Sequence, residues 1–155
     1  MTRASLTLLA LLGSAALLAG AFGFQYFGGL QPCHLCVLQR WPHGAAIAIG
    51  ILALILSARW LNWLGALAAA TTSGIGIYHT GVERGWFTGP QSCTSQMPTH
   101  GISAQDLLAN IMAAPVVRCD QTGIDTFLNL SMASWNAILS AILVLIWIAA
   151  ALRRT

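Results

Sequence analysis

Four cysteines are the side chains of this sequence best suited to chemistry, and they form two unlike pairs. Cys33 and Cys36 are separated by two residues, the usual spacing of a redox-active dithiol. A bond across so short a loop constrains the unfolded chain little, so a purely structural role suits this pair poorly. Cys93 and Cys119 enclose a long loop and suit a structural disulfide as well. The cysteines predict thiol–disulfide chemistry, with two structural disulfides as the alternative.

Haem attachment and metal binding are two further chemistries that cysteines can support. A c-type haem needs a histidine directly after the second cysteine, and Val37 stands there instead, which excludes that cofactor. Cysteines together with His34, His43 or His100 suit zinc or copper, although the spacing of a four-ligand zinc finger is absent. We therefore assign no metal and keep a metal-binding protein as an alternative.

Arg40 stands four residues after Cys36, so on a helix the guanidinium and the sulfur share a face. A neighbouring arginine stabilises thiolate over thiol. Pro32 suits the first position of a helix, whose dipole adds to the same effect. Pro42 is expected to interrupt this short helix. The alternative for Arg40 is an interfacial arginine that contacts lipid phosphates.

The composition places these residues in a membrane. The chain is 57% hydrophobic and 7% charged, whereas a soluble domain has about 25% charged residues. Apolar stretches long enough to cross a bilayer lie at about 5–27, 43–58, 61–79 and 127–152. We predict an all-α membrane protein, a bundle of four transmembrane helices forming a single domain over 1–155. The net charge of +3 comes from scattered arginines without a basic patch, so nucleic-acid binding is excluded.

The first apolar stretch has a second interpretation. Arg3, the apolar run and residues 19–21 (AGA) resemble a cleavable signal peptide. The uncharged stretch is longer than the roughly 7–15 residues of a signal core, so we favour a membrane span.

The charges predict the orientation of the bundle. One side carries Arg3, Arg59, Arg153 and Arg154; the other carries the remaining three arginines and all four acids. An arginine excess marks the cytoplasmic side, so both termini are expected there. The connections at 28–42 and 80–126, which hold all four cysteines, then share the non-cytoplasmic side, where disulfides persist.

The second of these connections is too long for a passive link. Ser103 and Asp106 bound a possible capping box, and the helix that follows ends before Pro115. The apolar side chains of this helix share one face, which is typical of a short amphipathic interfacial helix. Packing of that face on protein is the alternative.

Four segments together resemble the disulfide bond formation protein B (DsbB) family. They are Gln31–Trp41 (QPCHLCVLQRW), Tyr78–Glu83 (YHTGVE), Pro115–Asp120 (PVVRCD) and Leu130–Asn136 (LSMASWN). The resemblance implies an enzyme of the bacterial inner membrane whose cysteine loops are periplasmic. Such an enzyme re-oxidises a soluble DsbA-like thiol oxidase and passes the electrons to membrane quinone.

The resemblance also implies roles for the cysteines. Cys93 is attacked by the partner thiolate, Cys119 pairs with Cys93 at rest and exchanges with Cys33, and Cys36 faces the quinone. Electrons would pass from the partner to the second pair, then to the first pair, then to ubiquinone or menaquinone.

For the cofactor, the resemblance implies that Arg40 stabilises the thiolate and the reduced quinone, with His79 near the ring. Trp41 is expected to complete the apolar slot that holds the quinone ring, while the tail of the quinone lies in lipid. Position alone favours His79 as an interfacial residue at the end of a span. His34 departs from the apolar residue or proline common between the cysteines, and the residues at these two positions tune the redox potential of such a pair.

Two rival functions remain. A vitamin K epoxide reductase-like protein also reduces quinone with four helices, but its dithiol lies on the last span. A non-enzymatic membrane scaffold or metal-binding protein with structural disulfides is the other.

Overall fold

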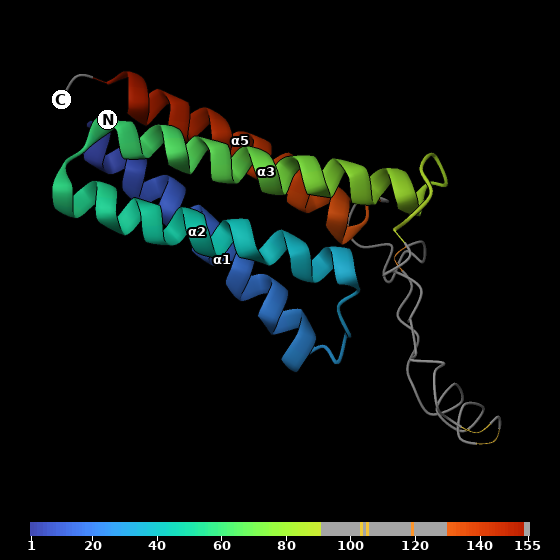
Figure 1. Cartoon of the computed structure of the whole chain (residues 1–155). Coiled ribbons are helices and arrows are strands. Elements are labelled where there is room, and N and C mark those ends of the chain that lie inside the picture. Colours follow the sequence, from blue (N-terminus) through green and yellow to red (C-terminus); the bar gives the residue numbers. More distant parts are fainter. Residues whose placement is uncertain (91–102, 104, 106–118, 120–129, 154–155) are drawn as a thin grey trace.

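The computed structural model describes residues 1–90, 103, 105, 119 and 130–153, and four long helices run side by side through them (Figure 1). Their bounds are α1 Arg3–Tyr26, α2 His34–Leu56, α3 Arg59–Glu83 and α5 Met132–Leu152. Within these described residues there is no strand, so the all-α prediction is confirmed for them. The start of α1, the end of α5 and the α2–α3 turn lie at one end of the bundle, and the start of α2 lies at the other (Figure 1).

Three of the helices can cross a membrane. α1, α2 and α5 are long and apolar enough by length and composition, which makes the chain a membrane protein. α3 does not reach this level because it carries polar side chains, of which Asn62 and Ser73 are buried. Thr7 donates to Asn62 at 2.9 Å and Ser73 donates to the Ala137 carbonyl at 2.9 Å. Polar groups in an apolar medium need such internal partners, and these polar side chains of α3 accordingly face the interior of the bundle.

The structure corrects two predictions about the start of the second helix. α2 runs without a break from His34 to Leu56, with Pro42 inside it. The proline removes one backbone hydrogen bond, whereas ending the helix there would leave several groups unpaired in an apolar setting. Pro32 does not occupy the first helical position either. The cap is Cys33, one residue later, and Pro32 precedes it.

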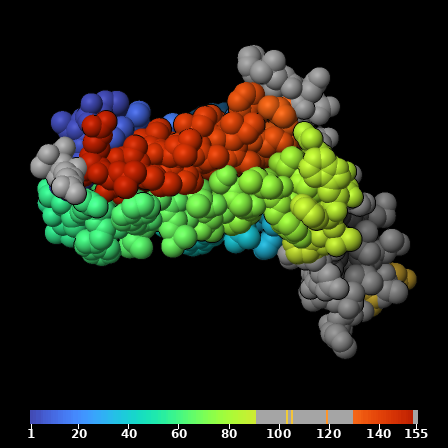
Figure 2. Space-filling model, turned by 90° about the horizontal axis from the view of Figure 1, so that it is seen from above, coloured from blue at the N-terminus to red at the C-terminus, as the bar shows by residue number. Residues whose placement is uncertain are grey.

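The end of the bundle that holds the termini has a tightly packed core. Trp147 is fully buried against Ala66, Ala69 and Leu143. Gly65 makes room for the indole, because a Cβ atom there would lie 2.6 Å from the Trp147 ring. α3 and α5 can therefore pack side by side along their lengths, as the green and orange-red surfaces of Figure 2 show.

Two sequence predictions fall partly outside the described residues. The amphipathic helix expected after Ser103 lies there, apart from residues 103 and 105, and so does Cys93. The last helix begins at Met132, with Ser131 as its cap, so the helix predicted from about residue 127 does not include the described residues 130 and 131.

Candidate redox site

Cys33 caps the second helix with its own sulfur. The sulfur accepts a hydrogen bond from the backbone N–H of Cys36 at 3.3 Å. A side chain at the cap position reaches the N–H three residues later, and this is the separation of the two cysteines. The sulfur, whose residue is 5% exposed, therefore sits at the positive end of the α2 dipole, where negative charge is stabilised.

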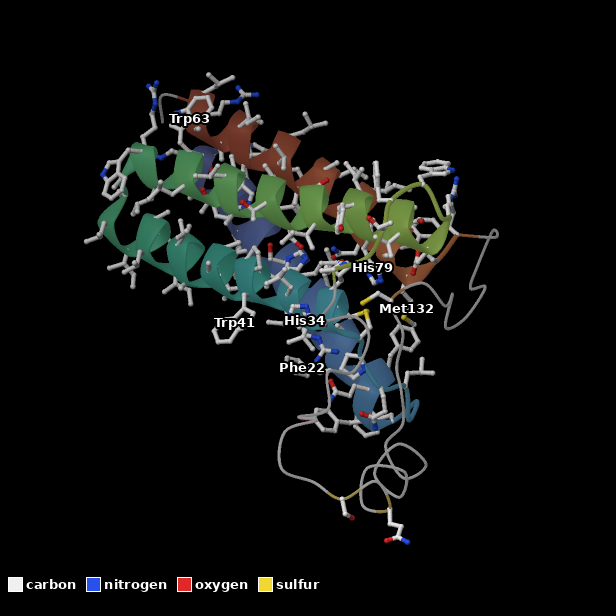
Figure 3. All side chains as sticks on the ribbon, turned by 45° about the vertical axis from the view of Figure 1, so that its right-hand side comes forward. Phe22, His34, Trp41, Trp63, His79 and Met132 are labelled. Carbon is white, nitrogen blue, oxygen red and sulfur yellow. The ribbon has the colours of Figure 1, made fainter. Side chains whose placement is uncertain are left out.

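The other cysteine and a histidine from α3 converge on the same sulfur. The sulfurs of Cys33 and Cys36 lie 3.1 Å apart, and His79 Nε2 lies 3.5 Å from Cys33 Sγ. Figure 3 shows His79 beside the yellow sulfur atoms. With the thiolate on Cys33, the Cys36 thiol, the His79 ring and the Cys36 backbone can all donate to it. The Cys36 thiol contributes most, and together these donors overcome burial and lower the pKa of Cys33 to about 4.

Cys119 lies against this dithiol. It is 1% exposed and packs in one cluster with Cys33, Leu35 and Val82. Its backbone also makes a hydrogen bond with the His79 ring. Cys119 is in a disulfide, while Cys33 and Cys36 are both free. The structure thus brings cysteines of both predicted loops together.

An acidic residue supports the histidine from the next turn of α3. Glu83 Oε1 lies 3.8 Å from His79 Nε2, and the Glu83 side chain is only 7% exposed. The hydroxyl of Ser131, the cap of α5, donates to the other carboxylate oxygen. Negative charge at Glu83 favours a proton on His79, which is the donor that a Cys33 thiolate needs.

On the other side of His79, polar side chains run deeper into the bundle. Gln39 Nε2 lies 3.0 Å from His79 Nδ1, and Asn136 Nδ2 donates to Gln39 Oε1 at 2.6 Å. His43 Nε2 lies 3.0 Å from Asn136 Oδ1. His43 is not among the residues grouped around the two sulfurs, where the histidine is His79. His34 is exposed, and His100 lies outside the described residues.

Arg40 ties α2 to α1. Its guanidinium donates to the Gln25 side chain and to the Ala21 carbonyl, and it lies 4.8 Å from the centre of the Phe22 ring. Its Nε is buried without a hydrogen-bond partner among the described residues. Trp41, the next residue, points away from the bundle (Figure 3) and is 75% exposed.

A cavity of about 680 Å³ opens beside the dithiol and is lined by residues of α1, α2, α3 and α5. Its walls are largely apolar and include several polar side chains. The apolar lining includes Leu17, Phe24, Trp135 and Leu139, and the polar lining includes Cys36, Arg40, His43 and His79. Three of the predicted cofactor contacts therefore line one cavity. Trp41 does not line it; Trp135 of α5 does.

Comparison with known proteins agrees with this geometry. A family model described as Disulfide bond formation protein DsbB matches residues 3–150. The chain belongs to the DsbB family.

Relatives within and beside this family cover most of the chain. The Disulfide bond formation protein B of Acidovorax sp. (strain JS42) is 30% identical over 90% of this chain and 84% of its own length. That of Marinobacter nauticus is also 30% identical, over 90% of this chain and 86% of its own. The uncharacterized protein RP370 of Rickettsia prowazekii is 29% identical over 83% of this chain and 76% of its own. No solved structure matches the chain.

As a DsbB-family protein, the chain is a membrane-bound disulfide oxidoreductase.

Several residues of its site were missed by the sequence analysis. They are Gln39, His43 in its observed role, Glu83, Ser131 and Asn136. A usable signal existed, because polar side chains inside apolar spans are costly and tend to be functional. Their partners, however, lie on other helices, and the sequence alone does not pair them.

Proposed function

We propose that this protein is a quinone-dependent thiol–disulfide oxidoreductase of the bacterial inner membrane. It re-oxidises a soluble DsbA-like thiol oxidase at Cys93 and passes the electrons through its two cysteine pairs to ubiquinone or menaquinone. The single observation that carries the proposal is the Cys33–Cys36–His79 cluster, which borders an apolar cavity on one side and Cys119 on the other.

Transfer between the pairs proceeds by balanced exchange. The partner thiolate attacks Cys93, which releases Cys119 as a thiolate; Cys119 then attacks the Cys33–Cys36 disulfide at Cys33, which releases Cys36. The second thiolate of the partner then attacks the partner–Cys93 bond, which forms the partner disulfide and releases Cys93. Cys93 attacks the Cys119–Cys33 bond at Cys119, which releases Cys33. Each exchange forms one S–S bond and breaks one, so the first pair ends as a dithiol.

The unusual acidity of Cys33 fits the last of these exchanges. A thiol of low pKa leaves a disulfide faster, and the donors around Cys33 lower its pKa to about 4. Cys33 and Cys119 belong to one buried cluster, which keeps Cys119 close to the sulfur that it attacks in the earlier exchange. The site is thereby suited to deliver a reduced Cys33–Cys36 pair to the cavity.

The residues that line the cavity fit a quinone. Its volume of about 680 Å³ is within the usual range for small-molecule sites, and its apolar walls suit a ring that enters from lipid. Arg40 Nε and His43 Nδ1 are buried without partners among the described residues, and both residues belong to the lining. When bound, the quinone supplies the oxidising power, since it takes up the two electrons and two protons that the dithiol loses.

For the membrane, we propose four spans with both termini in the cytoplasm and the cysteines facing the periplasm. Helix α3 serves as the remaining span, because its 25 residues exceed the length needed to cross the hydrocarbon core. Arg3 and Arg59 start α1 and α3 at the end that holds the termini (Figure 1), in keeping with a positive cytoplasmic side.

Turnover by the purified protein tests this function. Reduced DsbA-like partner and quinone are mixed with the protein, and loss of quinone absorbance is followed. Cys36→Ser and Cys93→Ser should abolish turnover, whereas a scaffold with structural disulfides gives none even in the wild type. Full turnover by either variant contradicts the proposed relay.

Quinone affinity tests the cavity separately. Arg40→Met should weaken quinone binding roughly 10-fold or more, because a hydrogen bond from a charged donor contributes about 1.5–3 kcal/mol. Arg84→Met is the matched control, since Arg84 caps α3 and lies over the Trp86 ring outside the cavity. Equal affinities for the two variants would exclude Arg40 from the quinone site.

A further inference from the structure

Two buried histidines, His79 and His43, are linked by hydrogen bonds through two side-chain amides. His79 on α3 contacts Gln39 on α2, Gln39 contacts Asn136 on α5, and Asn136 contacts His43, one turn further along α2. The three contacts measure 3.0, 2.6 and 3.0 Å. His43, Gln39 and His79 are each no more than 6% exposed, so water does not readily substitute for these partners.

The chain of hydrogen bonds has a direction, because each amide has one donating and one accepting end. Asn136 donates to Gln39, and Gln39 Nε2 donates to His79 Nδ1. The proton of neutral His79 is then on Nε2, facing Cys33. Because Asn136 Oδ1 can only accept, neutral His43 carries its proton on Nε2 and donates it to Asn136. The Nδ1 atom of His43 is then unprotonated.

Thr72 supports this direction. Its hydroxyl donates to the backbone carbonyl of Gln39 at 3.1 Å, so its oxygen is free to accept from Asn136 Nδ2 at 3.3 Å. Asn136 Nδ2 thus has two acceptors in front of it, and its carbonyl oxygen is left for His43.

Protonation of His79 reverses every link. A charged imidazole donates from both nitrogens, so Gln39 must turn its oxygen toward Nδ1 and its NH₂ toward Asn136. Asn136 must then turn its own oxygen toward Gln39 and its NH₂ toward His43 Nε2. Two donors facing each other at a buried site are costly, so His43 moves its proton to Nδ1.

We propose that Gln39 and Asn136 are positioning residues that couple the protonation state of His79, beside the dithiol, to the ring tautomer of His43 in the cavity wall. His43 Nδ1 has no partner among the described residues, and His43 lines the cavity. It therefore offers the cavity a bare nitrogen when His79 is neutral and an N–H when His79 is charged.

The two states of His43 suit different ligand oxygens. An N–H donates to a carbonyl oxygen, and a bare nitrogen accepts from a hydroxyl; these are the oxidised and reduced forms of a quinone oxygen. This assignment of the ligand rests on the proposed function, whereas the coupling of the histidines does not. Among the residues that the structure describes, the ionisable groups near His79 are Cys33, Cys36 and Glu83, and Arg40 lines the same cavity as His43.

Nitrogen NMR of ¹⁵N-histidine-labelled protein tests the coupling without quinone or partner. The full chain is placed in lipid bilayers with Cys33 and Cys36 reduced, and protonation of each ring nitrogen is followed against pH. As His79 gains its second proton, the His43 proton should move from Nε2 to Nδ1 over the same pH range. A His43 tautomer that stays unchanged across the His79 titration would overturn the proposal.

Two variants sharpen the result. Asn136→Leu removes the link, so His43 should no longer follow His79. Gln39→Glu places a carboxylate, which can only accept, next to His79. It should keep a proton on His79 Nδ1 across the whole titration. Ser73→Ala is the matched control, because Ser73 donates to the Ala137 carbonyl and lies outside the chain of amides.

If Asn136→Leu does not fold, Asn136→Asp gives the same information. As long as it is ionised, its carboxylate only accepts, so the His43 proton should stay on Nε2 while His79 titrates. Continued switching of His43 in these variants refutes the coupling. Loss of quinone reduction with intact switching would refute the proposed function alone, because the NMR experiment contains no quinone.

Discussion

Replacement of His79 by phenylalanine should raise the pKa of the Cys33 thiol and make the site sensitive to mild acid. His79 Nε2 lies 3.5 Å from Cys33 Sγ and is one of the donors that lower the Cys33 pKa to about 4 from its ordinary 9.0. A hydrogen bond to a charged group contributes about 1.5–3 kcal/mol, and one pKa unit corresponds to 1.36 kcal/mol. Loss of this donor should therefore raise the pKa by about one to two units.

The size of the shift decides where to measure it. Because the pKa of Cys33 is depressed in the fold, its thiolate is present at neutral pH and is lost as the pH falls through about 4. At pH 7 the thiolate fraction would change by less than about 10%. At pH 5 it would fall from about 0.9 to between about 0.5 and 0.1, a roughly 2- to 10-fold loss of reactive thiolate.

The rate of alkylation of Cys33 by iodoacetamide reads this fraction directly. Cys36→Ser provides the background, because the serine hydroxyl can still donate to the Cys33 thiolate. Tyr78→Phe is the control: it removes the hydroxyl that donates to the Thr88 carbonyl, one residue from His79 on an exposed face. A His79→Phe profile that matches the wild type, or an equal shift in Tyr78→Phe, refutes the assignment of His79 as a thiolate donor.

Two predictions concern the packing that holds the site. Gly65→Ala should lower the thermal unfolding midpoint in detergent, since its Cβ would lie 2.6 Å from the Trp147 ring, whereas Gly74→Ala, with nothing within 4 Å, should raise stability by up to about 1 kcal/mol. Equal effects of the two alanines would contradict this account of the α3–α5 contact. Ser131→Ala should cost about 1 kcal/mol of unfolding free energy, because it removes the cap that accepts from the Ser134 N–H at 3.2 Å; an unchanged midpoint would show that the cap is dispensable.

Local patterns in the sequence predicted the parts of the site that lie close along the chain. The spacing of Cys33 and Cys36 indicated a dithiol, and the structure adds the reason why that spacing works: the first sulfur caps α2 on the N–H of the second cysteine. Arg40 was expected on the same helical face as Cys36, and both line the cavity. Trp41 was grouped with them, although the next residue on a helix is turned by about 100°, and it points outward.

The predictions that failed concern the strength of competing local effects. Pro42 is usually a helix breaker, yet α2 continues through it, because an apolar environment penalises unpaired backbone groups more than one lost hydrogen bond. The role of the helix dipole was assigned to Cys36, whereas the cap position belongs to Cys33. A difference of two residues at the helix start decides which sulfur lies at the cap.

By itself, the sequence determined the membrane class, the helical architecture, the reactive cysteines and, through its motifs, the family, because composition, apolar length and short spacings are local properties. Only the tertiary structure decided what surrounds the Cys33 sulfur. His79, Gln39 and Asn136 come from three helices, and Gln39 and Asn136 are 97 residues apart. Which buried polar groups meet depends on how the helices rotate and pack against one another, and that packing brings the dithiol, its proton donor and the cavity together.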